Sequence, residues 1–90
     1  MAGARTWTVE ITITEHEDER RTHAAAVLRG VRPYLRGEGE AYRRPSDREV
    51  PEVGDELAAA RALADLASKA LDVATGDVEQ FSHRHARLLA

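Results

Sequence analysis

The segment from Arg43 to Leu66 constrains the fold of this chain more than any other part of the sequence. Its residues 45–48, Pro-Ser-Asp-Arg, are typical of a turn. Pro51 suits the first turn of a helix, and Asp55 and Glu56 follow it where the helix dipole favours negative charge. We therefore expect a turn and then an amphipathic helix, a layout that contains no catalytic motif.

The helix expected after Pro51 runs to about Ala74 and is apolar around most of its circumference. At about 100 degrees per residue, its polar residues fall in one narrow sector: Arg61, Asp65, Ser68, Lys69 and Asp72. The apolar remainder is wider than contact with one sheet requires. A final helix of the same chain or a second subunit must cover the extra flank.

The end of the chain predicts a second, short helix. Gly76 is a plausible helix stop, and residues 77–80 resemble a capping box that would begin a helix from Val78 to about His85. Two leucines close to the chain end suggest docking onto a partner. The candidate dimer or partner interface is therefore Leu63, Leu66, Val73, Leu88 and Leu89.

Strict alternation from Thr6 to Thr14 predicts a half-buried strand. Its apolar face, which we expect to pack against the long helix, carries Trp7, Val9, Ile11 and Ile13. Residues 15–21 are all charged or His and indicate a solvated turn. The run from Thr22 to Arg29 is rich in alanine and suits a helix, but after a short polar turn the return strand of a hairpin is preferred.

A third strand is expected from Gly37 to Arg44, where Gly37, Gly39 and Ala41 alternate with larger polar residues. Small residues turned towards an overlying helix would let that helix sit close. The predicted architecture is thus a single α+β domain spanning residues 1–90, with element order β-β-β-α-α and a three-stranded antiparallel sheet on a long helix.

The chain has 90 residues and four aromatic side chains, so its core must be small. A second copy would supply additional apolar area, which makes a homodimer our expectation. The absence of cysteine excludes disulfides and cysteine-based metal sites. The sequence shows no membrane span and no secretory signal, so we expect a cytoplasmic location.

No motif for a nucleophile, a phosphate loop or a dinucleotide is present. The four histidines and the acidic residues of the turn at 15–19 lack the spacing of a metal site. The carboxylates near the helix start have a structural reason to be there. We therefore expect no catalytic residues, no metal, no cofactor and no small-molecule substrate.

A net charge of −3 conceals a basic middle, because residues 20–48 hold eight Arg against three acids. Arginines with interleaved tyrosines are typical of RNA contacts. The candidate RNA- or ribosome-binding set is Arg29, Arg32, Arg36, Arg43, Arg44, Arg48, Tyr34 and Tyr42. In the alternative interpretation, the basic strands and the acidic helix neutralise one another within the fold or across a dimer.

Several of these motifs together resemble a family of short actinobacterial proteins of unknown function. The resemblance is carried by Trp7-Thr8-Val9, Gly37-x-Gly39-x-Ala41-x-Arg43, Pro45-x-Asp47-Arg48-x-Val50-Pro51-Glu52-Val53-Gly54-Asp55-Glu56-Leu57 and Ala86-Arg87-Leu88-Leu89. It implies a fold like that of double-stranded-RNA-binding domains, and a homodimer. The mycobacterial members of the family include dormancy-associated proteins, and members have been likened in shape to ribosome hibernation factors.

The resemblance brings no catalytic residues. The usual double-stranded-RNA domain has basic residues at its helix start, whereas this chain has Asp55 and Glu56 there, which would repel phosphates. The function expected from the sequence is a non-enzymatic, stress- or dormancy-linked homodimer that binds ribosome or RNA through an Arg-rich sheet edge. The alternative is a protein-interaction module with no nucleic-acid role.

Overall fold

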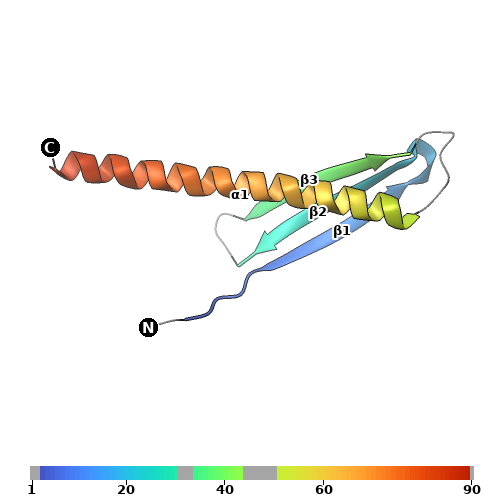
Figure 1. Cartoon of the computed structure of the whole chain (residues 1–90), viewed down its shortest axis with the longest axis horizontal. Coiled ribbons are helices and arrows are strands. Elements are labelled where there is room, and N and C mark those ends of the chain that lie inside the picture. The colour runs from blue at the N-terminus through green and yellow to red at the C-terminus, as the bar shows by residue number, and fades with distance from the viewer. Residues whose placement is uncertain (1–2, 31–33, 44–50, 90) are drawn as a thin grey trace.

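A computed structural model describes residues 3–30, 34–43 and 51–89, with the side chains of the helix described over residues 53–80. The chain forms strands β1 (Thr8–His16), β2 (Arg21–Arg29) and β3 (Leu35–Tyr42) and helix α1 (Pro51–Leu89). The strands are antiparallel in the order β1-β2-β3, and α1 lies across the sheet (Figure 1). The expected α+β fold, a three-stranded antiparallel sheet on a long helix, is confirmed.

The alanine-rich segment of β2 is a strand, as preferred from the sequence. It follows a short 3-10 turn (Glu17–Glu19), after which Arg20 takes a left-handed conformation with φ 49°. β2 then pairs along its length with β1 on one side and β3 on the other. Hydrogen bonding to two neighbours outweighs the helix propensity of its alanines.

One face of the sheet carries the small and apolar residues of all three strands. Residues directly opposite one another in an antiparallel sheet share a face. The register pairs Ile11 with Ala26, and Ala26 in turn with Gly37. The shared face therefore holds Val9, Ile11 and Ile13 of β1, Thr22, Ala24, Ala26 and Leu28 of β2, and Leu35, Gly37, Gly39 and Ala41 of β3.

Helix α1 packs on the part of this face formed by β2 and β3. Its buried residues Ala58, Ala62 and Leu66 recur every four positions and form the core with the alanines of β2. A Cβ on Gly39 would lie 2.3 Å from the backbone nitrogen of Ala62. The helix backbone therefore rests directly on the glycines of β3, and the predicted close approach is confirmed.

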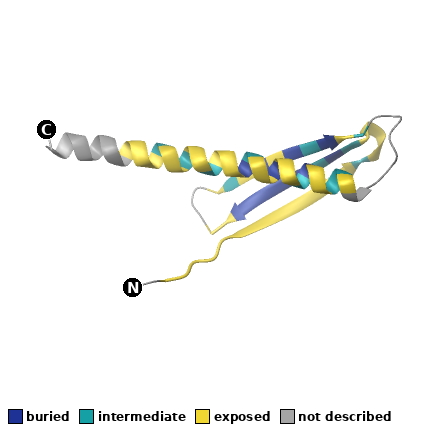
Figure 2. Ribbon diagram, viewed as in Figure 1, coloured by how far each residue is buried: buried dark blue, intermediate teal, exposed yellow. Residues whose placement is uncertain are grey.

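The apolar row of β1 faces the same side as the helix but is only partly covered by it. Val9, Ile11 and Ile13 are 40%, 38% and 42% exposed, whereas Ala24 and Ala26 opposite them are fully buried (Figure 2). The expected face of the sheet does meet the long helix, but α1 packs mainly on β2 and β3 and leaves this row partly exposed. A helix can approach glycine and alanine rows to backbone contact, whereas β-branched side chains would hold it further away.

The helix does not stop at Gly76. A single helix runs from Pro51 to Leu89, so the separate C-terminal helix expected from Val78 to His85 is wrong. A glycine inside a helix costs only about 1 kcal/mol relative to alanine, and the good helix formers Ala74, Glu79 and Gln80 lie within about one turn of Gly76. The C-terminal part of α1 consequently extends beyond the sheet (Figure 1).

Candidate interaction surfaces

The outer edge of β3 is closed by three side chains of α1. Lys69 Nζ donates to the Arg36 carbonyl oxygen at 2.9 Å, and Arg61 Nη1 donates to the Glu40 carbonyl oxygen at 2.7 Å. Between them, the Glu38 backbone N–H donates to Asp65 Oδ2 at 2.8 Å. The helix thus satisfies three of the backbone groups that an edge strand normally presents to another strand.

Asp65 is the centre of this arrangement. The hydrogen bond from the Glu38 N–H is the main reason that the pKa of the Asp65 carboxyl lies below its usual value. The hydrogen bond from the Lys69 ammonium lowers this pKa further. Lys69 Nζ also lies 3.0 Å from Asp65 Oδ2, which links neighbouring members of the set. The sequence placed these residues in one polar sector but did not reveal their role. Their spacing of four residues was the signal that they share one flank of the helix.

The edge formed by β1 is different. The residues of β3 whose backbone groups point outward are Arg36, Glu38 and Glu40. Because backbone direction alternates along each strand and the register is known, the residues of β1 with outward backbone groups are Val9, Ile11, Ile13 and Glu15. Among the described residues, no side chain donates to or accepts from these groups.

The face of the sheet away from the helix carries a network of opposite charges. Arg21 lies 2.9 Å from both Glu19 and Glu40, and the Tyr42 hydroxyl donates to Glu40. The hydrogen bond from the Tyr42 hydroxyl has the largest effect on the Glu40 carboxyl and lowers its pKa. The positive charge of Arg21 lowers this pKa further. The same hydrogen bond raises the pKa of Tyr42. The positive charge of Arg21 is therefore neutralised within the chain.

Two arginines of the candidate RNA set also meet acids on this face. Arg36 lies 3.2 Å from Glu38, and Arg29 lies 3.6 Å from Glu10. Exposed pairs of this kind contribute roughly 0.2–1 kcal/mol each. In the alternative interpretation, the acidic helix was expected to neutralise the arginines. The acid partners of the described arginines lie instead on the strands and on the turn between β1 and β2.

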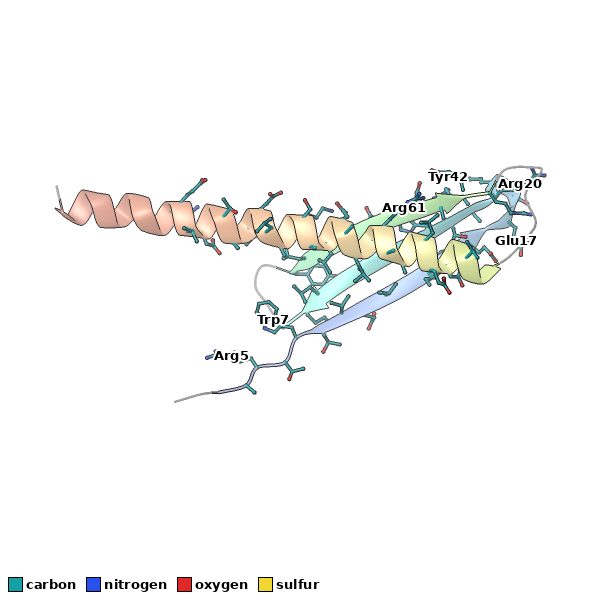
Figure 3. All side chains as sticks on the ribbon, in the orientation of Figure 1. Arg5, Trp7, Glu17, Arg20, Tyr42 and Arg61 are labelled. Carbon is teal, nitrogen blue, oxygen red and sulfur yellow. The ribbon has the colours of Figure 1, made fainter. Side chains whose placement is uncertain are left out.

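The candidate RNA set is divided between two ends of the sheet. Arg29, Tyr34 and Arg36 lie where β2 turns into β3, whereas Tyr42 and Arg43 lie at the other end of β3, beside the first turn. Figure 3 shows Trp7 near the first end and Tyr42 with Arg20 at the second. The remaining members, Arg32, Arg44 and Arg48, fall outside the described residues.

The residues predicted to form a dimer or partner interface differ in how far they are exposed. Leu63 is exposed and Val73 is half-buried, whereas Leu66 is only 5% exposed because it packs over Gly37 within the chain. Leu66 therefore belongs to the core, and its assignment to an interface is wrong. The side chains of Leu88 and Leu89 lie outside the described part of the helix.

No arrangement for catalysis or metal binding is found in the described part of the chain. There, no group of three or more His, Asp or Glu side chains converges as metal ligands would. A hollow at the first turn is lined by residues 15–19, which are mostly acidic and exposed. Within the described residues, no helix is both long and apolar enough to cross a membrane.

These features define a class of small α+β proteins in which a helix covers two strands of an antiparallel sheet. The chain belongs to the Rv2632c-like family, whose pattern matches residues 5–87. It is 52% identical over 83 residues to the uncharacterized protein Mb1767 of Mycobacterium bovis, covering 92% of this chain and 86% of that protein. It is 38% identical over 80 residues to the uncharacterized protein Rv2632c of Mycobacterium tuberculosis, covering 89% and 84% respectively.

The crystal structure of Rv2632c has the same fold. It aligns with a TM-score of 0.83 and 36% sequence identity, covering 91% of this chain and 95% of that one. The predicted relationship to mycobacterial proteins of unknown function is confirmed. None of these relatives indicates a catalytic family.

Proposed function

We propose that this chain is a non-catalytic interaction protein that works as a homodimer, joined through the β1 half of its sheet. The observation that carries the proposal is the apolar row Val9, Ile11 and Ile13, which stays about 40% exposed although its neighbours on β2 are buried. An uncovered apolar row beside an unprotected strand edge is typical of a surface that meets another chain.

A second copy is the partner that suits the size of the chain. The buried core consists mostly of alanines, which contribute little burial each. Small chains with such cores gain stability by association. We include in this proposal the cytoplasmic location that we expect from the sequence. We also include the link to stress or dormancy that the family resemblance implies.

Sedimentation equilibrium of the purified chain tests the proposal. The wild-type chain should sediment as a dimer, and Ile11→Asp should sediment as a monomer because a carboxylate would enter the apolar contact. Val78→Asp is the matched control, since Val78 is also exposed but lies on α1. A monomeric wild-type chain would reject the proposal, and loss of the dimer in Val78→Asp alone would move the contact to the helix.

Binding of RNA or ribosome through the arginines is the second candidate. It is favoured by the proximity of Arg29, Arg36 and the exposed Tyr34 at the β2–β3 end of the sheet. It is opposed by the acids that accompany both arginines there. A protein with no nucleic-acid role is therefore the interpretation that the described charges favour.

Co-sedimentation with 30S and 70S ribosomes at low and moderate salt separates the two candidates. Ribosome binding predicts a complex that weakens steeply with salt. It should be lost in one of two charge-reversal variants, Arg29→Glu/Arg36→Glu or Arg43→Glu/Arg44→Glu/Arg48→Glu. Arg29 and Arg36 lie at the β2–β3 end of the sheet, whereas Arg43 lies at the other end of β3. If neither salt condition gives a complex, the protein-interaction function stands alone.

A further inference from the structure

We propose that two copies of this chain join edge to edge through β1, in antiparallel register centred on Ile11, to form one continuous sheet. This inference rests on the proposed homodimer and specifies how its subunits pair. It starts from the contrast between the two sheet edges. α1 hydrogen-bonds to the outward groups of β3 at Arg36, Glu38 and Glu40, whereas the long, regular β1 has no such cover among the described residues.

The outward backbone groups of β1 belong to its apolar residues. Val9, Ile11 and Ile13 point their N–H and C=O groups away from β2, as the register and the β3 hydrogen bonds require. An antiparallel strand adding at this edge therefore forms hydrogen-bonded pairs at these three positions. Pairing at the edge and contact between apolar side chains thus involve the same residues.

The sequence of β1 is complementary to itself in one register. When Ile11 stands opposite Ile11 of the second copy, Val9 meets Ile13 and Thr8 meets Thr14. Glu10 then meets Thr12, so no two acids stand directly opposite. Every apolar residue of the strand interior has an apolar partner, and such cross-strand pairs stabilise a sheet.

The neighbouring registers are less favourable. Centring on Glu10 places that carboxylate opposite Glu10 of the second copy, and like charges directly opposite are destabilising. Centring on Thr12 places Val9 opposite Glu15 of the second copy. Charge and apolar matching therefore select the register centred on Ile11.

The helix is compatible with this pairing. Residues directly opposite share a face, so the apolar rows of the two copies lie side by side on the face that carries α1. Each apolar row then lies beside the row of the other copy along its whole length. This contact buries the side of Val9, Ile11 and Ile13 that is exposed in the single chain. Because α1 lies over β2 and β3 (Figure 1), it stands clear of the new contact, and the two rows form the floor between the two helices.

Cysteine scanning tests the register directly, because the chain contains no cysteine of its own. Each register brings a different residue opposite itself, so the single variants Glu10→Cys, Ile11→Cys and Thr12→Cys report on the three alternatives. Hydrogen-bonded antiparallel partners have Cα atoms about 5.5 Å apart, within disulfide range, whereas diagonal neighbours at about 7–8 Å are not. Under mild oxidation, Ile11→Cys should form the linked dimer at least tenfold faster than the other two.

The outcomes separate this inference from the proposed homodimer. Fastest linkage at Thr12→Cys or Glu10→Cys would overturn the register. No linkage at any of the three positions in a chain that still sediments as a dimer would overturn edge pairing and leave the homodimer intact. A monomeric wild-type chain would overturn both.

Amide exchange gives a second measurement that needs no substitution. The N–H groups of Ile11 and Ile13 should exchange at least tenfold more slowly at concentrations where the chain is dimeric than after dilution to monomer. The N–H of Thr12, which points towards β2, is the internal reference. Equal exchange of Ile11 and Ile13 in both states would overturn edge pairing.

Discussion

Gly39 sets the distance between the sheet and the helix. A Cβ there would lie 2.3 Å from the Ala62 nitrogen and 2.5 Å from the Ala58 carbonyl oxygen, so the helix backbone would have to move. We expect Gly39→Ala to lower the free energy of unfolding by about 3 kcal/mol or more, at the upper end of overpacking costs because backbone cannot yield as a side chain can. Urea denaturation followed by circular dichroism measures this change.

Gly76→Ala is the matched control for that substitution. A Cβ on Gly76 would have no neighbour within 4 Å, and the residue lies inside α1. We expect this variant to be more stable by about 1 kcal/mol, the usual difference between alanine and glycine in a helix interior. Equal effects of the two substitutions would show that the glycines of β3 are not required for close packing.

Asp65 makes the stability of the fold depend on pH in the acid range. Its folded-state pKa is lowered by the Glu38 N–H and by Lys69, so its contribution to stability is fully present above the ordinary pKa of an aspartate in the unfolded chain. That contribution is lost as the pH falls through the lower folded-state pKa. Thermal melts from pH 6 to pH 2 should therefore show a steeper loss of stability for the wild-type chain than for Asp65→Asn.

Asp72→Asn controls for the removal of one helix carboxylate, because Asp72 is exposed on the same helix. It should keep the acid dependence of the wild-type chain. If Asp65→Asn and the wild-type chain lose stability in parallel, the contact between Asp65 and the β3 edge does not contribute to stability.

The two edge strands of the sheet differ in what they can bind. β3 is occupied by Arg61, Asp65 and Lys69 of α1, and an edge without such cover is a template for pairing with other chains. We expect the triple variant Arg61→Ala/Asp65→Ala/Lys69→Ala to form species larger than a dimer, because both edges of the sheet are then open. Sedimentation velocity at increasing concentration would detect these species.

The double variant Ser68→Ala/Asp72→Ala is the control for this triple variant. Both residues are exposed on α1, and among the described contacts neither bonds to β3. This variant should remain dimeric. If the triple variant also remains dimeric, closing of the β3 edge by the helix is not what limits the size of the assembly.

At the scale of the whole molecule, association and stability should be linked. The buried core is made of small residues and one helix face, and a second copy that binds only the folded chain adds stability by mass action. The midpoint temperature of wild-type unfolding should therefore rise with protein concentration, whereas that of Ile11→Asp should be lower and independent of concentration. Calorimetry over a hundredfold concentration range measures both, and a wild-type midpoint that does not change would contradict a dimer formed by folded subunits.

The sequence determined the elements of this protein because their signals are local. Alternation of threonine with Val9, Ile11 and Ile13 predicted β1, and Pro51 with the acids after it predicted the start of α1 where the structure has it. The glycines of β3 predicted close contact with a helix, because no other residue type permits it. The end of α1 was missed, since a single glycine is too weak a signal to show whether a long helix continues.

Only the tertiary structure decided which strands the helix covers. The sequence shows that the rows of β1, β2 and β3 are small or apolar, but the position of a helix on a sheet depends on how closely each row lets its backbone approach. The same applies to Arg61, Asp65 and Lys69, whose partners are backbone groups of a strand distant in the chain. The closed edge of β3 and the open edge of β1 are therefore properties of the packing, which no local pattern encodes.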